Sequence, residues 1–134
     1  NVVTRTITGA NAHGSVLTLA GCDVNDERVG YSSQGPSIAG MPQNKPDITA
    51  YTHFSGSEAF GAGSPDSGTS TACPVAAGCV AALRTKRQAK FHKSSKIFAA
   101  LTGTAKQITG AGWNGDYGHG IIQPNAAATK LGIV

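Results

Sequence analysis

Charged side chains are scarce in this sequence. Only 13% of its 134 residues are Asp, Glu, Lys or Arg, which is about half the share in an average soluble domain. Aromatic residues make up 6%, whereas 40% of the residues are hydrophobic and 18 are glycine. We interpret this composition as the buried part of a globular protein with many turns, as in an α/β fold with short connections.

Long apolar runs are also absent, and so is a segment with the basic start and apolar middle of a signal peptide. We therefore expect a mature, soluble chain with no membrane partner. The net charge of +4 raises the question of nucleic acid. Six of the 11 basic residues lie between Arg84 and Lys96, where cations at a helix end are favoured by the dipole. Aromatic residues that could stack on bases are scarce there, so we expect no nucleic-acid partner.

Cysteine is limited to Cys22, Cys73 and Cys79. Three thiols cannot all pair, and Cys73 and Cys79 lie six positions apart on one predicted helix, so they point in different directions. No C-x-x-C spacing indicates a metal site. We expect all three to be small buried hydrophobic residues. Cys73 is a rival nucleophile to Ser70, but burial in a helix would make it inert.

The pattern of apolar runs and turn residues predicts three extended segments followed by three helices. We expect strands at 15–20 and 45–51, with a shorter extended piece at 29–33 between them. A helix should run from about Ser70 to Arg84, a second should start at Ser94, and the last should start at Pro124. One α/β domain accounts for all of these elements.

The most informative stretch is the polar turn at 66–70, which leads directly into the first predicted helix. Gly68 allows a sharp turn, and Pro74 is tolerated in a first helical turn. This places Ser70 at a helix N-terminus, where free N–H groups and the helix dipole meet. A serine hydroxyl there can attack a carbonyl, and its own N–H can hold the oxyanion. The alternative interpretation is an ordinary Ser/Thr helix cap.

The longer string decides between these interpretations. Gly68-Thr69-Ser70-x-Ala72-x-Pro74, followed by Ala77-Gly78, resembles the nucleophile signature of the subtilisin-like serine proteases, or subtilases. Val75 and Ala76 stand where that family usually has His and Val. Other segments resemble the family in the same order along the chain: Val16 to Gly21, Tyr31-Ser-Ser-Gln-Gly-Pro36 (similar to F-S-S-x-G), Lys45-Pro-Asp-Ile48, and Tyr117-Gly-His-Gly120 before an alanine-rich helix. The usual A-P-G continuation is replaced by Ala50-Tyr51-Thr52.

The resemblance implies a three-layer α/β sandwich with a mainly parallel sheet, of which residues 1–134 form the C-terminal portion. In subtilases the catalytic Asp and His precede the Ser in Gly-rich motifs, and neither motif occurs here. We therefore expect an N-terminal part of the same catalytic domain to supply them. Asn1 lies about where the family's oxyanion-binding Asn would fall, and Asn11 is a weaker candidate. The four histidines, His13, His53, His92 and His119, all have ordinary explanations.

The function implied is a serine endopeptidase that cleaves protein or peptide substrates through an acyl-enzyme on Ser70. An inactive subtilase-like fragment or binding module is one alternative, and a sedolisin-type serine-carboxyl peptidase is another. The chemistry requires no cofactor; calcium is common in the family, although no ligand cluster here can be assigned to it. The resemblance favours secretion, whereas three cysteines without an evident pairing leave an intracellular location open.

Overall fold

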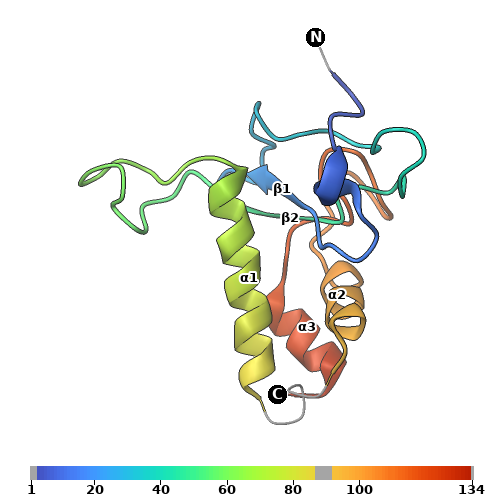
Figure 1. Cartoon of the computed structure of the whole chain (residues 1–134). Coiled ribbons are helices and arrows are strands. Elements are labelled where there is room, and N and C mark those ends of the chain that lie inside the picture. The colour runs from blue at the N-terminus through green and yellow to red at the C-terminus, as the bar shows by residue number, and fades with distance from the viewer. Residues whose placement is uncertain (1–2, 87–91, 134) are drawn as a thin grey trace.

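The chain folds as a small sheet with three helices beneath it (Figure 1). The structure is a computed structural model and describes residues 3–86 and 92–133. Its elements are the 3-10 helix η1 (Gly9–Ala12), the strands β1 (Leu19–Cys22) and β2 (Ile48–Tyr51), and the helices α1 (Thr69–Thr85), α2 (Ser94–Thr102) and α3 (Pro124–Leu131).

The two strands are parallel, with Leu19 opposite Ile48. A third extended segment adds to the far side of β2. There the N–H of Thr49 donates to the carbonyl of Gly120 at 2.8 Å, and the N–H of Ile122 donates to the carbonyl of Thr49 at 2.9 Å. Segments far apart in the sequence thus complete one layer, and β2 lies at its centre.

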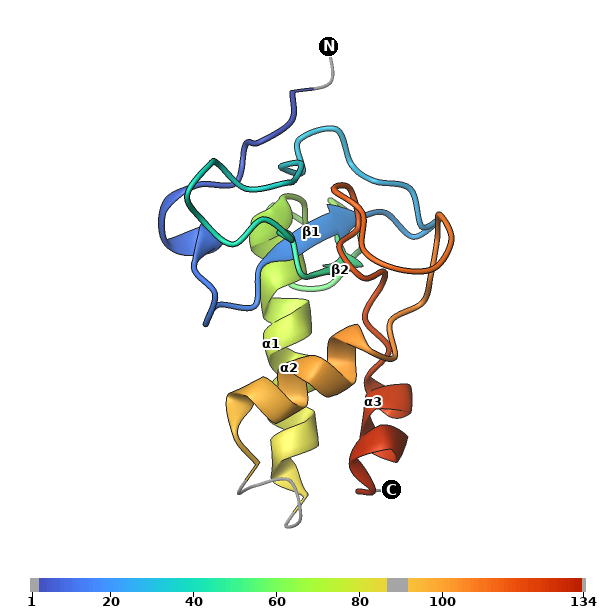
Figure 2. The same cartoon turned by 90° about the vertical axis from the view of Figure 1, so that its right-hand side faces the viewer.

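The two faces of this layer are covered differently. Ile48 and Ala50 project from one face of β2 into the core between the sheet and the helices, where they meet buried residues such as Ala72 and Leu101. This alternation is expected of a strand whose successive side chains point to opposite faces. The other face carries a smaller cluster of Cys22, Tyr117 and Ile121, which irregular segments cover. Figure 2 shows the helices together on the lower side of the strands.

The starts of the three helices agree with the sequence prediction, but Pro74 lies inside α1, as its sixth residue, and not in its first turn. α1 begins after Gly68 and ends one residue beyond Arg84. α2 begins at Ser94, with Ile97 and Leu101 buried. α3 has Pro124 in its first turn and ends at Leu131, and Gly132, with a φ of 69°, is its left-handed C-cap. The α/β class is therefore confirmed, with a small parallel sheet and one helical layer in the described chain.

The strands start later than the sequence predicts. The first begins at Leu19 instead of residue 15, because the hydroxyl and N–H of Thr18 bond to Asn11 and Asp47 before the strand begins. The prediction of an extended piece at 29–33 is wrong. The segment is a turn, held by the Arg28 guanidinium, which donates to the carbonyls of Val29 at 3.1 Å and Ser32 at 2.8 Å.

The Tyr-Gly-x-Gly segment has a steric reason for its glycines. Gly118 has a φ of 63°, a left-handed conformation that favours glycine. A Cβ at this position would collide with the backbone of Asp47. The N–H of His119 donates to the carbonyl of Asp47 at 2.8 Å, so close approach of the two backbones joins this loop to the start of β2.

Candidate active site

Ser70 is the second residue of α1, and its side chain is exposed. Gly68 occupies the N-cap with φ 101° and ψ 156°, and no side chain caps the helix there. Ser70 is therefore not the residue that caps α1, although a cap is the commonest role for serine near a helix start. Its hydroxyl lies beside the uncapped, electropositive end of a helix of 17 residues.

A cavity of about 660 Å³ opens beside Ser70. The residues around it come from four parts of the chain: the segment at η1, the segment from residue 16 into β1, the turn at 28–34, and the first turns of α1. They are Thr6, Ile7, Thr8, Asn11, Val16, Leu17, Thr18, Leu19, Ser33, Thr69, Ser70, Cys73, Pro74 and Ala77. Asn11, the weaker candidate for an oxyanion donor, thus borders the same cavity as Ser70. Asn1, the other candidate, lies outside the described residues.

The Tyr31 hydroxyl contacts the turn that precedes α1. The N–H of Gly68 donates to this oxygen at 2.7 Å. The same oxygen lies 3.3 Å from Oγ1 of Thr52 and 3.2 Å from Nδ1 of His53. The ring of Tyr31 also stacks on His53, with centroids 5.6 Å apart and planes at 22°. A single side chain therefore joins the end of β2 to the turn before Ser70.

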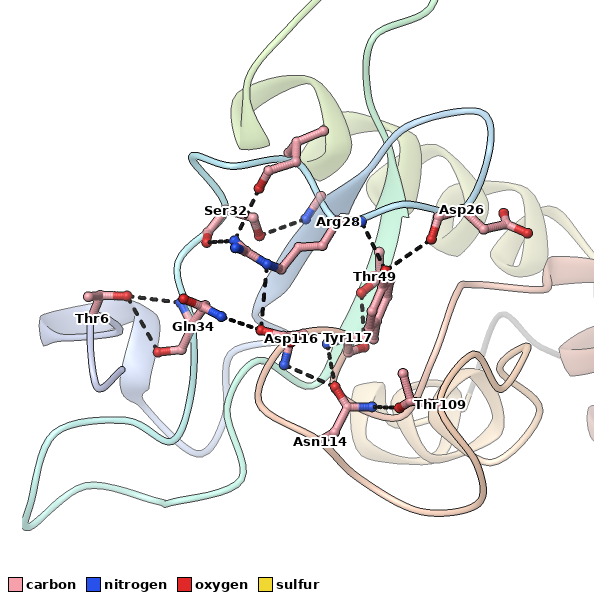
Figure 3. Close-up of polar contacts among 12 residues, drawn as sticks. Thr6, Asp26, Arg28, Ser32, Gln34, Thr49, Thr109, Asn114, Asp116 and Tyr117 are labelled. Carbon is pink, nitrogen blue, oxygen red and sulfur yellow. Dashed lines mark hydrogen bonds and ion pairs between the residues drawn. The ribbon is translucent and has the colours of Figure 1, made fainter. Parts of the chain in front are cut away.

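A polar network fixes the segment that carries Tyr31, as Figure 3 shows. Asp116, from the loop before α3, accepts a hydrogen bond from Nε2 of Gln34 and lies 3.5 Å from Nε of Arg28. Oγ of Ser32 accepts the N–H of Gly21 in β1 at 3.1 Å. The turn at 28–34 is thus held to β1 on one side and to the loop at 114–118 on the other.

The loop from His53 to Asp66 projects past the start of α1 (Figure 1). Its two ends are joined where the N–H of His53 donates to the carbonyl of Asp66, and the N–H of Asp66 to the carbonyl of Phe54, each at 2.8 Å. The buried Asp66 carboxylate accepts the hydroxyl of Ser57 at 2.6 Å and its N–H at 2.7 Å. These bonds lower the pKa of Asp66. Phe60 is 67% exposed on this loop.

A second charged cluster lies on the other face of the sheet. Asp26 pairs with Lys106 and accepts the hydroxyl of Tyr51 at 2.7 Å. The pKa of Asp26 is lowered, first by Lys106, and the hydrogen bond to Asp26 raises the pKa of Tyr51 to about 12. Burial raises the pKa of the Cys22 thiol to about 12 as well. This cluster joins the turn after β1 to the segment at 106 and contains no group poised to react with a substrate.

The prediction that all three cysteines are buried is wrong for Cys73. Cys22 is buried and Cys79 is partly buried, but Cys73 is exposed, and all three are free. α1 turns its Ala72 and Ala76 toward the sheet, so Cys73 lies on the neighbouring side of the helix and borders the cavity.

No described histidine is hydrogen-bonded to Ser70. His13 contacts Ser15 at 2.8 Å, and His53 contacts Tyr31. Asp47 bonds to Lys45 and Thr18 and makes no pair with His53.

Within residues 3–86 and 92–133, no group of three His, Cys, Asp or Glu side chains could hold a metal ion. In the same ranges, no helix has the length and apolar character needed to cross a membrane.

Sequence reasoning missed Tyr31 and Asp66 as residues that shape the site. Both act through contacts with residues distant in the chain, which local patterns do not reveal. One signal was available for Tyr31, since the segment that it begins resembles F-S-S-x-G, and the chain has a hydroxyl where that pattern has none. No comparable signal pointed to Asp66.

Comparison with known proteins gives two findings. The sequence matches the family model described as "Subtilase family" over residues 4–120. None of the curated proteins matches this chain.

Several solved protease structures share the fold. The CspB protease of Clostridium perfringens has a TM-score of 0.81 and 22% identity over 96% of this chain. The self-cleaved protease domain of PatA has a TM-score of 0.70 and 21% identity over 92%. Fervidolysin from Fervidobacterium pennivorans, described as a keratinolytic enzyme related to subtilisin, has a TM-score of 0.66 and 22% identity over 90%. The chain spans only 29%, 44% and 20% of these three structures, respectively.

Proposed function

This chain belongs to the subtilase family, and from that premise we propose that it carries the nucleophile of a serine endopeptidase, with Ser70 as the attacking residue. The observation that supports the proposal most directly is the position of Ser70, exposed in the first turn of α1 and bordering a cavity of about 660 Å³. The substrates are proteins or peptides, as the family implies.

The proposed reaction is acyl transfer. Oγ of Ser70 attacks the peptide carbonyl while a histidine accepts the hydroxyl proton, and that histidine then gives the proton to the leaving amine. The N–H of Ser70 donates to the oxyanion at the uncapped start of α1. A side-chain amide, from Asn1 or Asn11, supplies the second donor. Water then hydrolyses the acyl-enzyme and restores the hydroxyl. No cofactor takes part in these steps.

The catalytic His and Asp come, in this proposal, from the N-terminal part of the same catalytic domain, outside these 134 residues. The described chain has a surface that suits such a partner. Cys73, Pro74 and Ala77 form an exposed, uncharged side of α1 that borders the cavity. A segment packed there would lie beside Ser70, where a base has to be.

Labelling with a fluorophosphonate tests the proposal. The full-length protein that contains this chain should be labelled at Ser70, as located by peptide mapping, because the reagent reacts with an activated serine. Ser70→Ala should abolish the label. Ser67→Ala, which changes an exposed serine three positions earlier, should leave it unchanged. A correctly folded wild-type protein that takes no label, or takes it elsewhere, would contradict the proposal.

An inactive binding module is the second candidate function. It is favoured by one observation: among the described residues, no histidine is hydrogen-bonded to Ser70. The same labelling experiment separates the two candidates, since a module without a base would not react even when folded. Retained binding of a peptide by such an unlabelled protein would support this second candidate.

A further inference from the structure

One phenolic oxygen fixes the conformation of the turn before the proposed nucleophile. Gly68, two positions before Ser70, is where the chain changes direction and enters α1, with φ 101° and ψ 156°. As the N-cap residue it has no side chain with which to cap the helix. The N–H of Gly68 donates to Oη of Tyr31 at 2.7 Å, a distance typical of a well-formed hydrogen bond.

The Tyr31 hydroxyl is itself held in place from a second direction. It contacts Oγ1 of Thr52 and Nδ1 of His53, at 3.3 and 3.2 Å, and its ring stacks on the imidazole of His53. His53 has a φ of 58°, and its N–H donates to the carbonyl of Asp66 at 2.8 Å. The Tyr31–His53 pair thus contacts both ends of the turn at 66–68.

The backbone on either side of Tyr31 is held by hydrogen bonds to distant parts of the chain. Ser32 is buried, and its hydroxyl accepts the N–H of Gly21 in β1. Arg28 donates to the carbonyl of Ser32 and lies beside Asp116, which also accepts from Gln34 (Figure 3). The hydroxyl that contacts Gly68 is therefore attached to a hydrogen-bonded frame, and a group that positions another needs such support.

We propose that Tyr31 is a positioning residue for Ser70: its hydroxyl fixes Gly68, and thereby the direction in which the Ser70 hydroxyl and N–H enter the cavity. This inference rests on the proposed function of Ser70 as the nucleophile. Tyr31 acts through Gly68 and takes no part in bond making. A small displacement of a nucleophile lowers the rate of attack strongly, so loss of this one contact should slow the acylation step more than it weakens binding.

The test compares Tyr31→Phe with the wild type in the full-length protein. The variant keeps the ring and its stacking on His53 but removes the acceptor for Gly68. We expect the maximal rate of fluorophosphonate labelling at Ser70 to fall about three- to tenfold, the effect of one lost hydrogen bond. The reagent concentration for half-maximal rate should change less than about twofold, because binding contacts are retained. Hydrogen exchange of the Gly68 amide should accelerate by a similar three- to tenfold.

Tyr51→Phe is the matched control. It also removes one phenolic hydroxyl, which donates to Asp26 at 2.7 Å on the other face of the sheet. We expect labelling and Gly68 exchange in this variant to stay within about twofold of the wild type, because it alters one hydrogen bond away from that turn.

Three outcomes would overturn the inference: wild-type labelling and exchange in Tyr31→Phe, an equal loss in both variants, or a changed half-maximal concentration with an unchanged maximal rate. A wild-type protein without label would instead refute the proposed function. In that case only hydrogen exchange of the Gly68 amide tests the role of Tyr31, and an exchange rate that is unchanged in Tyr31→Phe would contradict the positioning role.

Discussion

Nζ of Lys45 lies 2.6 Å from Oδ2 of Asp47. The same carboxylate oxygen accepts the N–H of Thr18 at 2.6 Å, and Nζ also donates to the carbonyl of Val16 at 2.6 Å. Thr18 directly precedes β1 and Asp47 directly precedes β2, so this ion pair joins the two strands where they begin. It explains why the strands pair with Leu19 opposite Ile48, and it gives the Lys-Pro-Asp segment a structural role.

Lys45→Met should lower the free energy of unfolding by about 2–4 kcal/mol. The Lys45 side chain is only 3% exposed and that of Asp47 is 24% exposed, so removing the lysine leaves a largely buried carboxylate without its ion-pair partner. Lys106→Met is the control, because that lysine pairs with Asp26 but is 50% exposed and should cost less than about 1 kcal/mol. Denaturant unfolding monitored by circular dichroism measures both. Equal losses of unfolding free energy in the two variants would show that burial of Lys45 does not make its ion pair more stabilising than that of Lys106.

Gly118→Ala should destabilise the fold by about 3 kcal/mol or more. The alanine would have to keep a left-handed backbone conformation, which costs about 1–2 kcal/mol for a non-glycine residue. Its Cβ would also collide with the backbone of Asp47, and such overpacking costs a further 1–3 kcal/mol or so. Gly63→Ala separates the two effects, since Gly63 has a φ of 75° but open space around its Cβ position. Thermal unfolding should therefore show a smaller shift for Gly63→Ala, and similar shifts would refute the steric argument.

The loop at 53–66 should loosen in acid. Its carboxylate anchor, Asp66, has a pKa below the ordinary value, which is about 3.9 for Asp. Its contribution to stability is therefore complete above about pH 4 and is lost as the pH falls through the lowered folded pKa. Limited proteolysis across this pH range, with an acid-active protease, should show cleavage of the loop rising as the pH falls.

Asp66→Asn should remove this pH dependence, because the amide does not titrate and accepts the Ser57 bonds with one oxygen only. Glu58→Gln, which neutralises an exposed acid on the same loop, should keep the wild-type profile. If Asp66→Asn and the wild type are cleaved with the same pH profile, the loop is not anchored by this carboxylate.

The three thiols should react with N-ethylmaleimide in the order Cys73, Cys79, Cys22. Cys73 is exposed, whereas burial raises the pKa of Cys79, and raises that of Cys22 to about 12. At pH 8, a pKa near 12 leaves about one Cys22 side chain in ten thousand as the reactive thiolate. Mass spectrometry of a time course gives the order directly. Modification of Cys22 before Cys73 would contradict this order, because it would mean that the sheet around Cys22 opens faster than the exposed Cys73 thiol reacts.

The parts of this fold that sequence predicts are those fixed by local chemistry. Gly68 before a run of small residues predicted the start of α1, and Pro124 predicted the start of α3. The position of Ser70 at the start of α1 follows from that local turn, whereas its role as nucleophile stays a prediction. The strand at 15–20 was placed too early because Thr18 is held by Asp47, 29 positions later in the chain, and no local pattern contains such a contact.

The site itself was only partly predictable, for the same reason. The bond between Gly68 and Tyr31 joins residues 37 positions apart. Burial of Cys73 was predicted from the apolar character of its helix, but α1 buries only Ala72, Ala76 and Leu83. Which side of a small-residue helix meets the sheet depends on how the strands cross beneath it. Asn1 as an oxyanion donor stays a prediction, since it lies outside the described residues.

The position of β2 between β1 and Ile121 has a consequence for biosynthesis. One side of β2 is completed by bonds between Thr49 and the segment at 120–122, which the ribosome makes long after it has made the strand. A nascent chain that ends before Gly120 already contains α1 but lacks the segment that completes the sheet beside β2. Contacts between residues distant in the sequence are also slow to form. The layer that carries β2 is therefore complete only after the ribosome has made residues 120–122, about 50 residues after the turn that precedes α1.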